Sequence, residues 1–226
     1  MKKIVILQIL KQNKNRYKMN KSMKMWMMAA ILVFCGALVS GCQNKNEKAK
    51  PEKKEKVEKT EKTKTKTSLA DPNAYLGKVD DYLVSEIGSR YSQGEVCIPV
   101  AFVISADNGN TDDVKVWGDF WVFNFNISGD TLKTVSGGSH PGLMHLKQTE
   151  NGYVVTSFEQ VEDGAGNLES AKRIFGDKYD SFHEINSNAE KREDIRLHFV
   201  ADYVKKNNLK ATMLQDYGWP AVALPN

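Results

Sequence analysis

The architecture of this chain follows from residues 114–127, which read VKVWGDFWVFNFNI. Successive side chains of a β-strand point to opposite faces of its sheet, so odd and even positions form two separate rows. The odd row holds Trp117, Trp121, Phe123, Phe125 and Ile127, and the even row holds Val114, Val116, Phe120 and Val122. Both rows are apolar. Such a strand is central and covered on both sides, or one of its faces lines a cavity.

About four antiparallel strands are expected around this segment. They span residues 96–105, 114–127, a third strand in two parts (131–135 and 143–146) and 153–161. Turns rich in Asn, Asp, Ser and Gly separate them, as at Asn151-Gly152 before the last strand. The glycine-rich segment 136–142 is expected to break the third strand. Its glycines either allow the backbone to bend or expose N–H groups that bind an anion.

A helix is expected before the strands. Apolar residues recur there at three- and four-residue steps, from Tyr75 to Ile87, which makes one apolar face. Asp71-Pro72 favours the start of this helix, because Asp is a good N-cap and Pro suits the first helical turn. Gly88 is a natural end for it.

Further helical patterns follow the strands. Two short helices are expected over residues 168–175 and 177–185, and a longer one begins at the capping box 187–190. The aromatic tail 215–220 is not helical, and we expect it to dock on the domain. This order of elements predicts an α+β domain over residues 71–226, with an N-terminal helix packed on a curved antiparallel sheet and helices at the C-terminal end.

One long helix cradled by a curved antiparallel sheet resembles the cystatin-like and NTF2-like folds. The resemblance covers residues 71–226 at the level of element order and uses no motif. It implies a cavity between the sheet and a helix, with Trp121, Phe123 or Tyr153 near the cavity wall. Domains with these folds include non-catalytic ligand or protein binders as well as enzymes, so the fold alone does not choose a function.

The N-terminal segment has the layout of an export signal. Residues 1–25 contain lysines and no acidic residue, and an apolar run extends from Trp26 to Val39. This run is shorter than the roughly 20 residues that a membrane-spanning helix needs. The four residues that end it, Val39-Ser40-Gly41-Cys42, resemble the lipobox of bacterial lipoproteins. An ordinary secreted protein cut elsewhere, or a short membrane anchor, is the alternative.

The lipobox resemblance implies a place for the protein. The signal peptide, residues 1–41, would be removed after Gly41, and Cys42 would receive diacylglycerol on its sulfur. The chain would then be lipid-anchored to the cell membrane or the outer membrane, facing away from the cytoplasm. Acyl chains contribute about 0.8 kcal/mol for each buried CH₂ group, so two or three of them anchor a protein stably.

Residues 42–70 are predicted to be a disordered tether rich in Lys, Glu and Thr. Between residues 43 and 67 only Ala49 and Val57 are apolar, so nothing offsets the entropy cost of ordering the chain. Residues 68–226 hold 14 Lys and Arg against 23 Asp and Glu, a formal net charge of −9. An acidic domain on a basic tether argues against nucleic acid as a partner.

Aromatic side chains are the strongest candidates for ligand contact, because each buries a large area. The predicted ligand-binding set comprises Trp117, Trp121, His140 and Tyr153, and the tail adds Tyr217 and Trp219. We therefore expect a non-catalytic binding or interaction module of the cell envelope. Its partner would be a protein, a glycan or a small molecule.

Two other functions stay open. An envelope hydrolase would use His140 with a nearby carboxylate, Asp163 or Glu159, in acid–base chemistry. A structural envelope component would instead need a surface for self-association. The sequence contains no nucleophile elbow, phosphate-binding glycine loop, dinucleotide fingerprint or zinc-protease helix, and we predict no cofactor.

The histidines and cysteines do not predict a metal site. His140 and His145 are five residues apart, so on one regular strand they face opposite sides, and spacing suggests no third ligand. Cys97 is the only cysteine after Cys42 and lies in an apolar run. It is interpreted as a small buried apolar side chain, and a single cysteine forms no disulfide within the domain.

Overall fold

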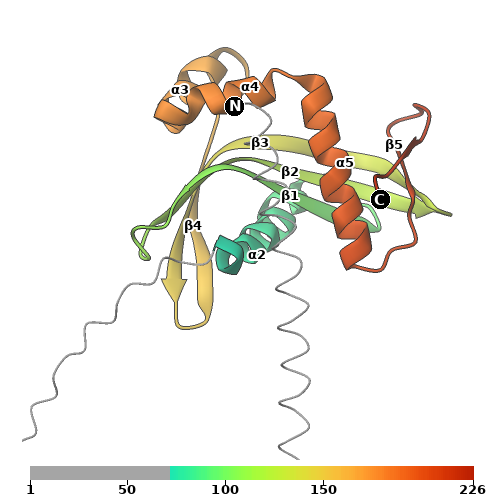
Figure 1. Ribbon diagram of the computed structural model, residues 1–226, viewed down its shortest axis with the longest axis horizontal. Coiled ribbons are helices and arrows are strands. Elements are labelled where there is room, and N and C mark those ends of the chain that lie inside the picture. The colour runs from blue at the N-terminus through green and yellow to red at the C-terminus, as the bar shows by residue number, and fades with distance from the viewer. Residues whose placement is uncertain (1–71) are drawn as a thin grey trace, which may run out of the picture. The chain divides into compact units, whose positions relative to one another are not determined.

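The computed structural model describes residues 72–226, and Figure 1 shows their arrangement. In chain order the elements are α2 (Pro72–Tyr82), β1 (Val96–Asp107), β2 (Val114–Ser128), β3 (Thr131–Thr149), β4 (Gly152–Gln160), α3 (Asn167–Phe175), α4 (Tyr179–Asn186), α5 (Ala189–Lys206), β5 (Met213–Gln215) and β6 (Val222–Ala223). The α+β class is confirmed. The predicted signal peptide, Cys42, the tether and Asp71 lie outside the described residues.

The strands form one open, six-stranded sheet. Its order is β1-β2-β3-β5-β6, and β4 also pairs with β3. The β3–β5 pairing is parallel and the others are antiparallel. The two strands missing from the prediction, β5 and β6, come from the tail, which docks on the sheet edge. They are too short to leave an alternating pattern in the sequence.

Strand β3 is the longest element of the sheet, and two strands share one of its edges. At one end β4 pairs with residues 142–149, and at the other end β5 pairs with residues 131–133. Between these pairings, residues 134–140 have no strand partner on this edge among the described strands. Strand β2 pairs with the opposite edge of β3 along nearly its whole length.

The expected break in the third strand is wrong, because β3 runs continuously through the glycine-rich segment 136–142. Its glycines allow neighbouring groups to approach the backbone closely. A β-carbon on Gly138 would collide with the Tyr91 hydroxyl, and one on Gly142 would collide with the Glu159 carbonyl oxygen. The glycines therefore serve close packing and not a bend.

Both rows of β2 are covered, as its sequence predicts. The even row packs with Tyr75, Val79 and Leu83 at the N-terminal helix, and we call this side of the sheet the α2 face. On the other side, the α5 face, Phe125 packs against Val200 and Val204 of α5. Figure 1 shows α2 and α5 on opposite sides of the sheet. Each large apolar side chain buried in this way contributes roughly 1.5–3 kcal/mol.

The C-terminal helices cover the α5 face in two groups. Near one end of β2, Trp117 packs with Ile174 and Phe175 of α3 and with Phe182 of α4. Helix α5 covers the other end. Its N-cap is Asn188, whose side-chain oxygen accepts a hydrogen bond from the Lys191 backbone nitrogen at 2.9 Å. The capping box predicted at 187–190 therefore begins one residue too early.

No helix in residues 72–226 is long and apolar enough to cross a bilayer.

Candidate functional site

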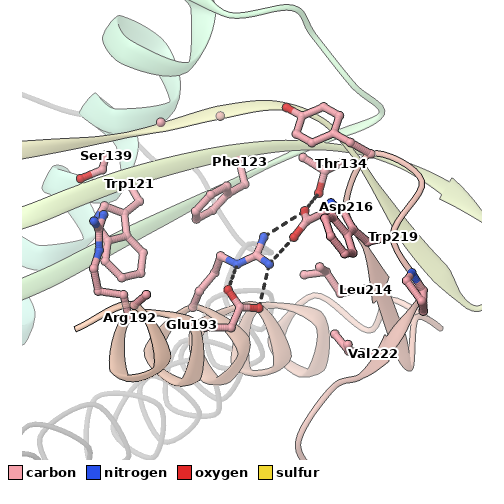
Figure 2. A pocket seen from close by; sticks show the side chains of 16 residues that line it. Trp121, Phe123, Thr134, Ser139, Arg192, Glu193, Leu214, Asp216, Trp219 and Val222 are labelled. Carbon is pink, nitrogen blue, oxygen red and sulfur yellow. Dashed lines mark hydrogen bonds and ion pairs between the residues drawn. The ribbon is translucent and has the colours of Figure 1, made fainter. Parts of the chain in front are cut away.

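A cavity of about 590 Å³ lies on the α5 face, between the sheet, the start of α5 and the C-terminal tail. Figure 2 shows its wall. Strands β2 and β3 supply one side, with Trp121, Phe123 and Ser139, and α5 supplies the opposite side. Its volume is within the range of small-molecule sites, which is roughly 300–1,000 Å³.

The centre of the cavity is built from two arginines that lie over two aromatic rings. The guanidinium carbon of Arg192 is 5.3 Å from the Trp121 ring centroid, and that of Arg196 is 5.4 Å from the Phe123 ring centroid. The spacing explains this pairing. Four residues along a helix and two along a strand both advance about 6–7 Å, so two successive arginines of α5 meet two successive odd positions of β2.

Arg196 is held by two carboxylates. It donates hydrogen bonds to Glu193 at 2.9 and 2.8 Å and to Asp216 Oδ1 at 3.2 Å, and it also donates to Asp216 Oδ2. Burial opposes the charge, yet these bonds raise the pKa of Arg196 above its ordinary value. Burial by itself would raise the pKa of Asp216. The hydrogen bonds from Arg196 and Thr134 outweigh burial, so the pKa of Asp216 is lowered overall. This cluster fastens the tail to α5 and β3.

Arg192 lies one turn earlier on α5 and is much less constrained. Its nearest carboxylate oxygen is Asp119 Oδ2 at 3.6 Å, which is an ion-pair distance but too long for a good hydrogen bond. Within residues 72–226 its guanidinium makes this ion pair and the contact with Trp121. The side chain is 31% exposed and lines the cavity.

Asp119 is a buried acid at the edge of this site. It is 1% exposed and lies opposite Phe102 of β1 in the sheet register. Ser139, a cavity residue, donates a hydrogen bond of 2.6 Å to its Oδ1. Neither Asp119 Oδ2 nor the indole nitrogen of Trp121 has a hydrogen-bond partner of normal geometry in the described chain. Burial raises the pKa of Asp119 above its ordinary value.

Replacing this acid, Asp119→Asn, should stabilise the fold at neutral pH by on the order of 1 kcal/mol, because a buried and partly unsatisfied charge is removed. The raised pKa sets the pH dependence. Above the unfolded pKa of about 3.9 the unfolded chain loses its proton before the folded chain does, so wild-type stability falls as pH rises. In urea unfolding the variant should therefore have the larger free energy of unfolding at pH 7, and the two values should converge below about pH 4. A variant less stable than wild type at pH 7 would contradict this expectation.

The mouth of the cavity carries two solvent-exposed aromatic side chains. Tyr217 is 71% exposed and Trp219 is 72% exposed, and both belong to the cavity wall. Both belong to a tight turn, in which Tyr217 has a φ of 34° and Gly218 a φ of 87°. A left-handed conformation is uncommon for a large residue, and such residues cluster at ligand-binding sites.

The structure brings part of the predicted ligand-binding set together. Trp121, Tyr217 and Trp219 line one cavity, and so does Phe123. Trp117 is elsewhere, because its indole nitrogen donates a 2.8 Å hydrogen bond to the Ile174 carbonyl oxygen beneath α3. Tyr153 is buried on the α2 face, where its ring meets Tyr75 edge-on at 5.8 Å between centroids.

His140 also lies away from the cavity, opposite Phe120 of the even row. Its Nε2 is 3.0 Å from the Tyr91 hydroxyl, and burial lowers its pKa. Among the described residues it forms no ion pair with Asp163 or Glu159. The charges of Asp119 and Asp163 nevertheless act on His140 and oppose the effect of burial on its pKa.

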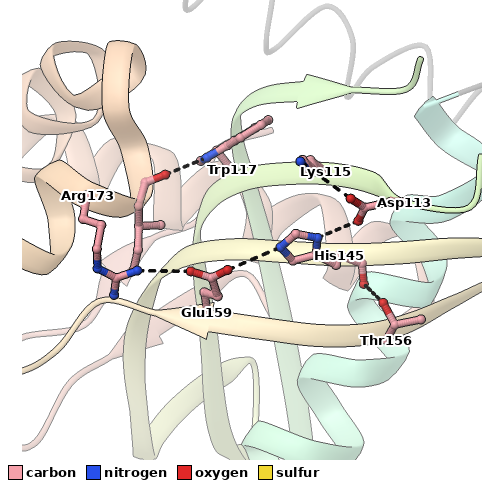
Figure 3. A network of polar contacts seen from close by, with 8 residues as sticks. Asp113, Lys115, Trp117, His145, Thr156, Glu159 and Arg173 are labelled. Atoms are coloured by element: carbon pink, nitrogen blue, oxygen red, sulfur yellow. Dashed lines mark hydrogen bonds and ion pairs between the residues drawn. The ribbon is translucent and has the colours of Figure 1, made fainter. Parts of the chain in front are cut away.

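A different histidine contacts Glu159, as Figure 3 shows. The Nδ1 of His145 is 2.6 Å from Asp113 Oδ1, and its Nε2 is 3.6 Å from Glu159 Oε1. The hydrogen bond from His145 lowers the pKa of Asp113. Arg173 pairs with the other Glu159 oxygen at 3.3 Å. In residues 72–226 no three His, Cys, Asp or Glu side chains form a group that could hold a metal ion.

Five charged residues of the cavity region were missed from the sequence: Asp119, Arg192, Glu193, Arg196 and Asp216. One signal for two of them exists. Arg192 and Arg196 continue the face of α5 that carries Phe199 and Tyr203, at steps of four, three and four residues. Charged residues on the face of a helix that packs against the domain indicate polar groups opposite them. Here those groups are the carboxylates of Asp119 and Asp216 beside the cavity.

Comparison with known proteins adds no relative. No protein-family model, curated protein or solved structure matches this chain.

Proposed function

We propose that this chain is a membrane-tethered, non-catalytic binding module of the bacterial cell envelope, and that its cavity holds a saccharide. The observation that carries the proposal is the composition of the cavity wall. Aromatic rings, charged donors and charged acceptors surround the same space, and two exposed aromatic side chains stand at its mouth.

A sugar ring matches both parts of this wall. Its C–H face packs on aromatic rings such as Trp219, and its hydroxyl groups both donate and accept hydrogen bonds. Arg192 offers donors, and Glu193 and Asp216 offer acceptors. A purely apolar ligand would displace water from these charged groups without replacing its hydrogen bonds, which is costly. A ligand that is polar throughout would not use the rings.

In this proposal the tether would hold the cavity among the saccharides of the envelope. In the proposal, lipid on Cys42 holds the chain at the membrane and residues 43–67 separate the domain from the surface. At most roughly 3.3 Å per residue, this segment reaches about 80 Å when fully extended. Its lysines and glutamates favour an extended chain. The domain would therefore sample envelope glycans some distance from the bilayer.

The proposal is tested by titrating the full chain, purified in detergent, with N,N′-diacetylchitobiose and with its acidic counterpart, N-acetylglucosaminyl-N-acetylmuramic acid. Tryptophan fluorescence and calorimetry should show saturable binding of at least one disaccharide. Trp219→Ala should weaken that binding about tenfold, because a well-packed aromatic contact contributes more than 1 kcal/mol.

The matched control is Leu168→Ala, which removes another exposed apolar side chain outside the cavity wall. It should leave affinity unchanged. Absence of saturable binding of both disaccharides at millimolar concentration would overturn the saccharide proposal.

A further inference from the structure

We infer that the saccharide bound in this cavity carries a carboxylate and that Arg192 is the residue that binds it. The inference rests on the proposed function and names the class of ligand. It comes from comparing Arg192 with Arg196, because the two arginines share a helix and each lies over an aromatic ring of β2.

Arg196 shows what such an arginine holds when its contacts are complete. Its planar guanidinium binds Glu193 on one side and Asp216 on another. Among the described residues, Arg192 has one carboxylate partner, Asp119 at 3.6 Å, in addition to its contact with the Trp121 ring. The position that a second carboxylate would take is therefore open, and Arg192 lines the cavity. Paired N–H groups of arginine match the two oxygens of a carboxylate, which makes the resulting contact short and strong.

The surroundings of Arg192 favour an anion. It ends the first turn of α5, and the N-terminal end of a helix carries a partial positive charge. Ala189, the first residue of α5, also lines the cavity. Ser139 adds a hydroxyl beside Asp119 at this end.

Of the two acidic residues of the cavity wall, Asp216 lies away from Arg192 and Glu193 lies between them. Figure 2 shows Arg192 beside Trp121, whereas Asp216 lies beyond the Arg196 guanidinium. Glu193 and Asp216 are both hydrogen-bonded to Arg196, whose single positive charge offsets one of their two negative charges. Asp119 competes weakly for Arg192, because its contact of 3.6 Å is too long for a good hydrogen bond. Arg192 is therefore the cation of the cavity wall whose carboxylate contact is the weaker, and it is the one that a ligand carboxylate can pair with.

The experiment compares the two disaccharides named above, which differ by a lactyl carboxylate. Wild type should bind the acidic disaccharide about tenfold more tightly than the neutral one, since a charge-assisted bidentate contact is added. In Arg192→Gln the ratio of the two affinities should fall to about one. In Arg192→Lys it should lie between, because lysine keeps the charge but loses the paired donors.

The control is Lys191→Gln, which removes a neighbouring cation that pairs with Glu184 outside the cavity wall. It should keep the full ratio. If Arg192→Gln does not fold, the double variant Asp119→Asn/Arg192→Gln removes the buried acid as well and serves instead. Equal affinities in wild type, or a ratio that survives loss of Arg192, would overturn this inference alone. Failure of both disaccharides to bind would overturn the proposed function together with it.

Discussion

A chain with Cys42→Ser should incorporate no fatty acid, whereas the parent chain should be labelled completely. The reason is chemical, since lipoprotein modification forms a thioether with the cysteine sulfur and a serine hydroxyl does not replace it. The measurement is labelling of growing cells with an alkyne-bearing palmitate, followed by the mass of the N-terminal peptide of the mature chain. That peptide should begin at residue 42 and carry diacylglycerol.

Two cysteines of the same chain provide matched controls for the lipidation experiment. Cys35→Ser changes the apolar run of the proposed signal peptide, and Cys97→Ser changes the half-buried thiol of β1. Both variants should keep the label. A label that persists in Cys42→Ser, or an unmodified N-terminus at another position, would remove the basis for the proposed membrane tether.

Arg196→Ala should destabilise the folded domain by about 2 kcal/mol. Breaking a fully buried pair costs roughly 3–5 kcal/mol, but Glu193 and Asp216 are 47% and 31% exposed, so water stabilises part of the charge that the substitution leaves unpaired. Urea unfolding of the full chain measures the loss. The tail should also become sensitive to protease near Asp216, because its strongest attachment to α5 is gone.

The comparison variant for this prediction is Arg173→Ala. Arg173 is 63% exposed and pairs with Glu159 at the surface, where an ion pair contributes at most about 1 kcal/mol. If Arg173→Ala lost as much stability as Arg196→Ala, the Arg196 cluster would contribute no more than a surface ion pair. An unchanged protease pattern in Arg196→Ala would show that other contacts hold the tail.

Much of the fold could be predicted because the informative patterns are local. The two apolar rows of β2 predicted a strand covered on both faces, and the odd row contains two aromatic walls of the cavity, Trp121 and Phe123. The end of α3 at Phe175 was also predicted correctly, and its start was predicted within one residue of Asn167. Such signals depend on residues within a few positions of each other, which is why sequence reading recovers them.

The rest could not be predicted because it depends on contacts between distant segments. Asp216 reaches Arg196 only when the tail pairs with β3. There Asp216 accepts a hydrogen bond from Thr134, which lies 82 residues earlier in the chain. Tyr153 and Trp121 have similar aromatic character, yet pairing of β4 with β3 places Tyr153 on the α2 face. The cystatin-like and NTF2-like resemblance stays a prediction.

The incomplete pairing along one edge of β3 affects how the molecule behaves at high local concentration. Free backbone N–H and C=O groups on a strand attract strands of other molecules and seed aggregates. Here residues 134–140 form a notch about 20 Å long, closed at either end by β4 and β5. A long strand from a neighbouring molecule does not fit into such a notch. This stretch of β3 beside the cavity is therefore a poor template for pairing with the long strands of another molecule.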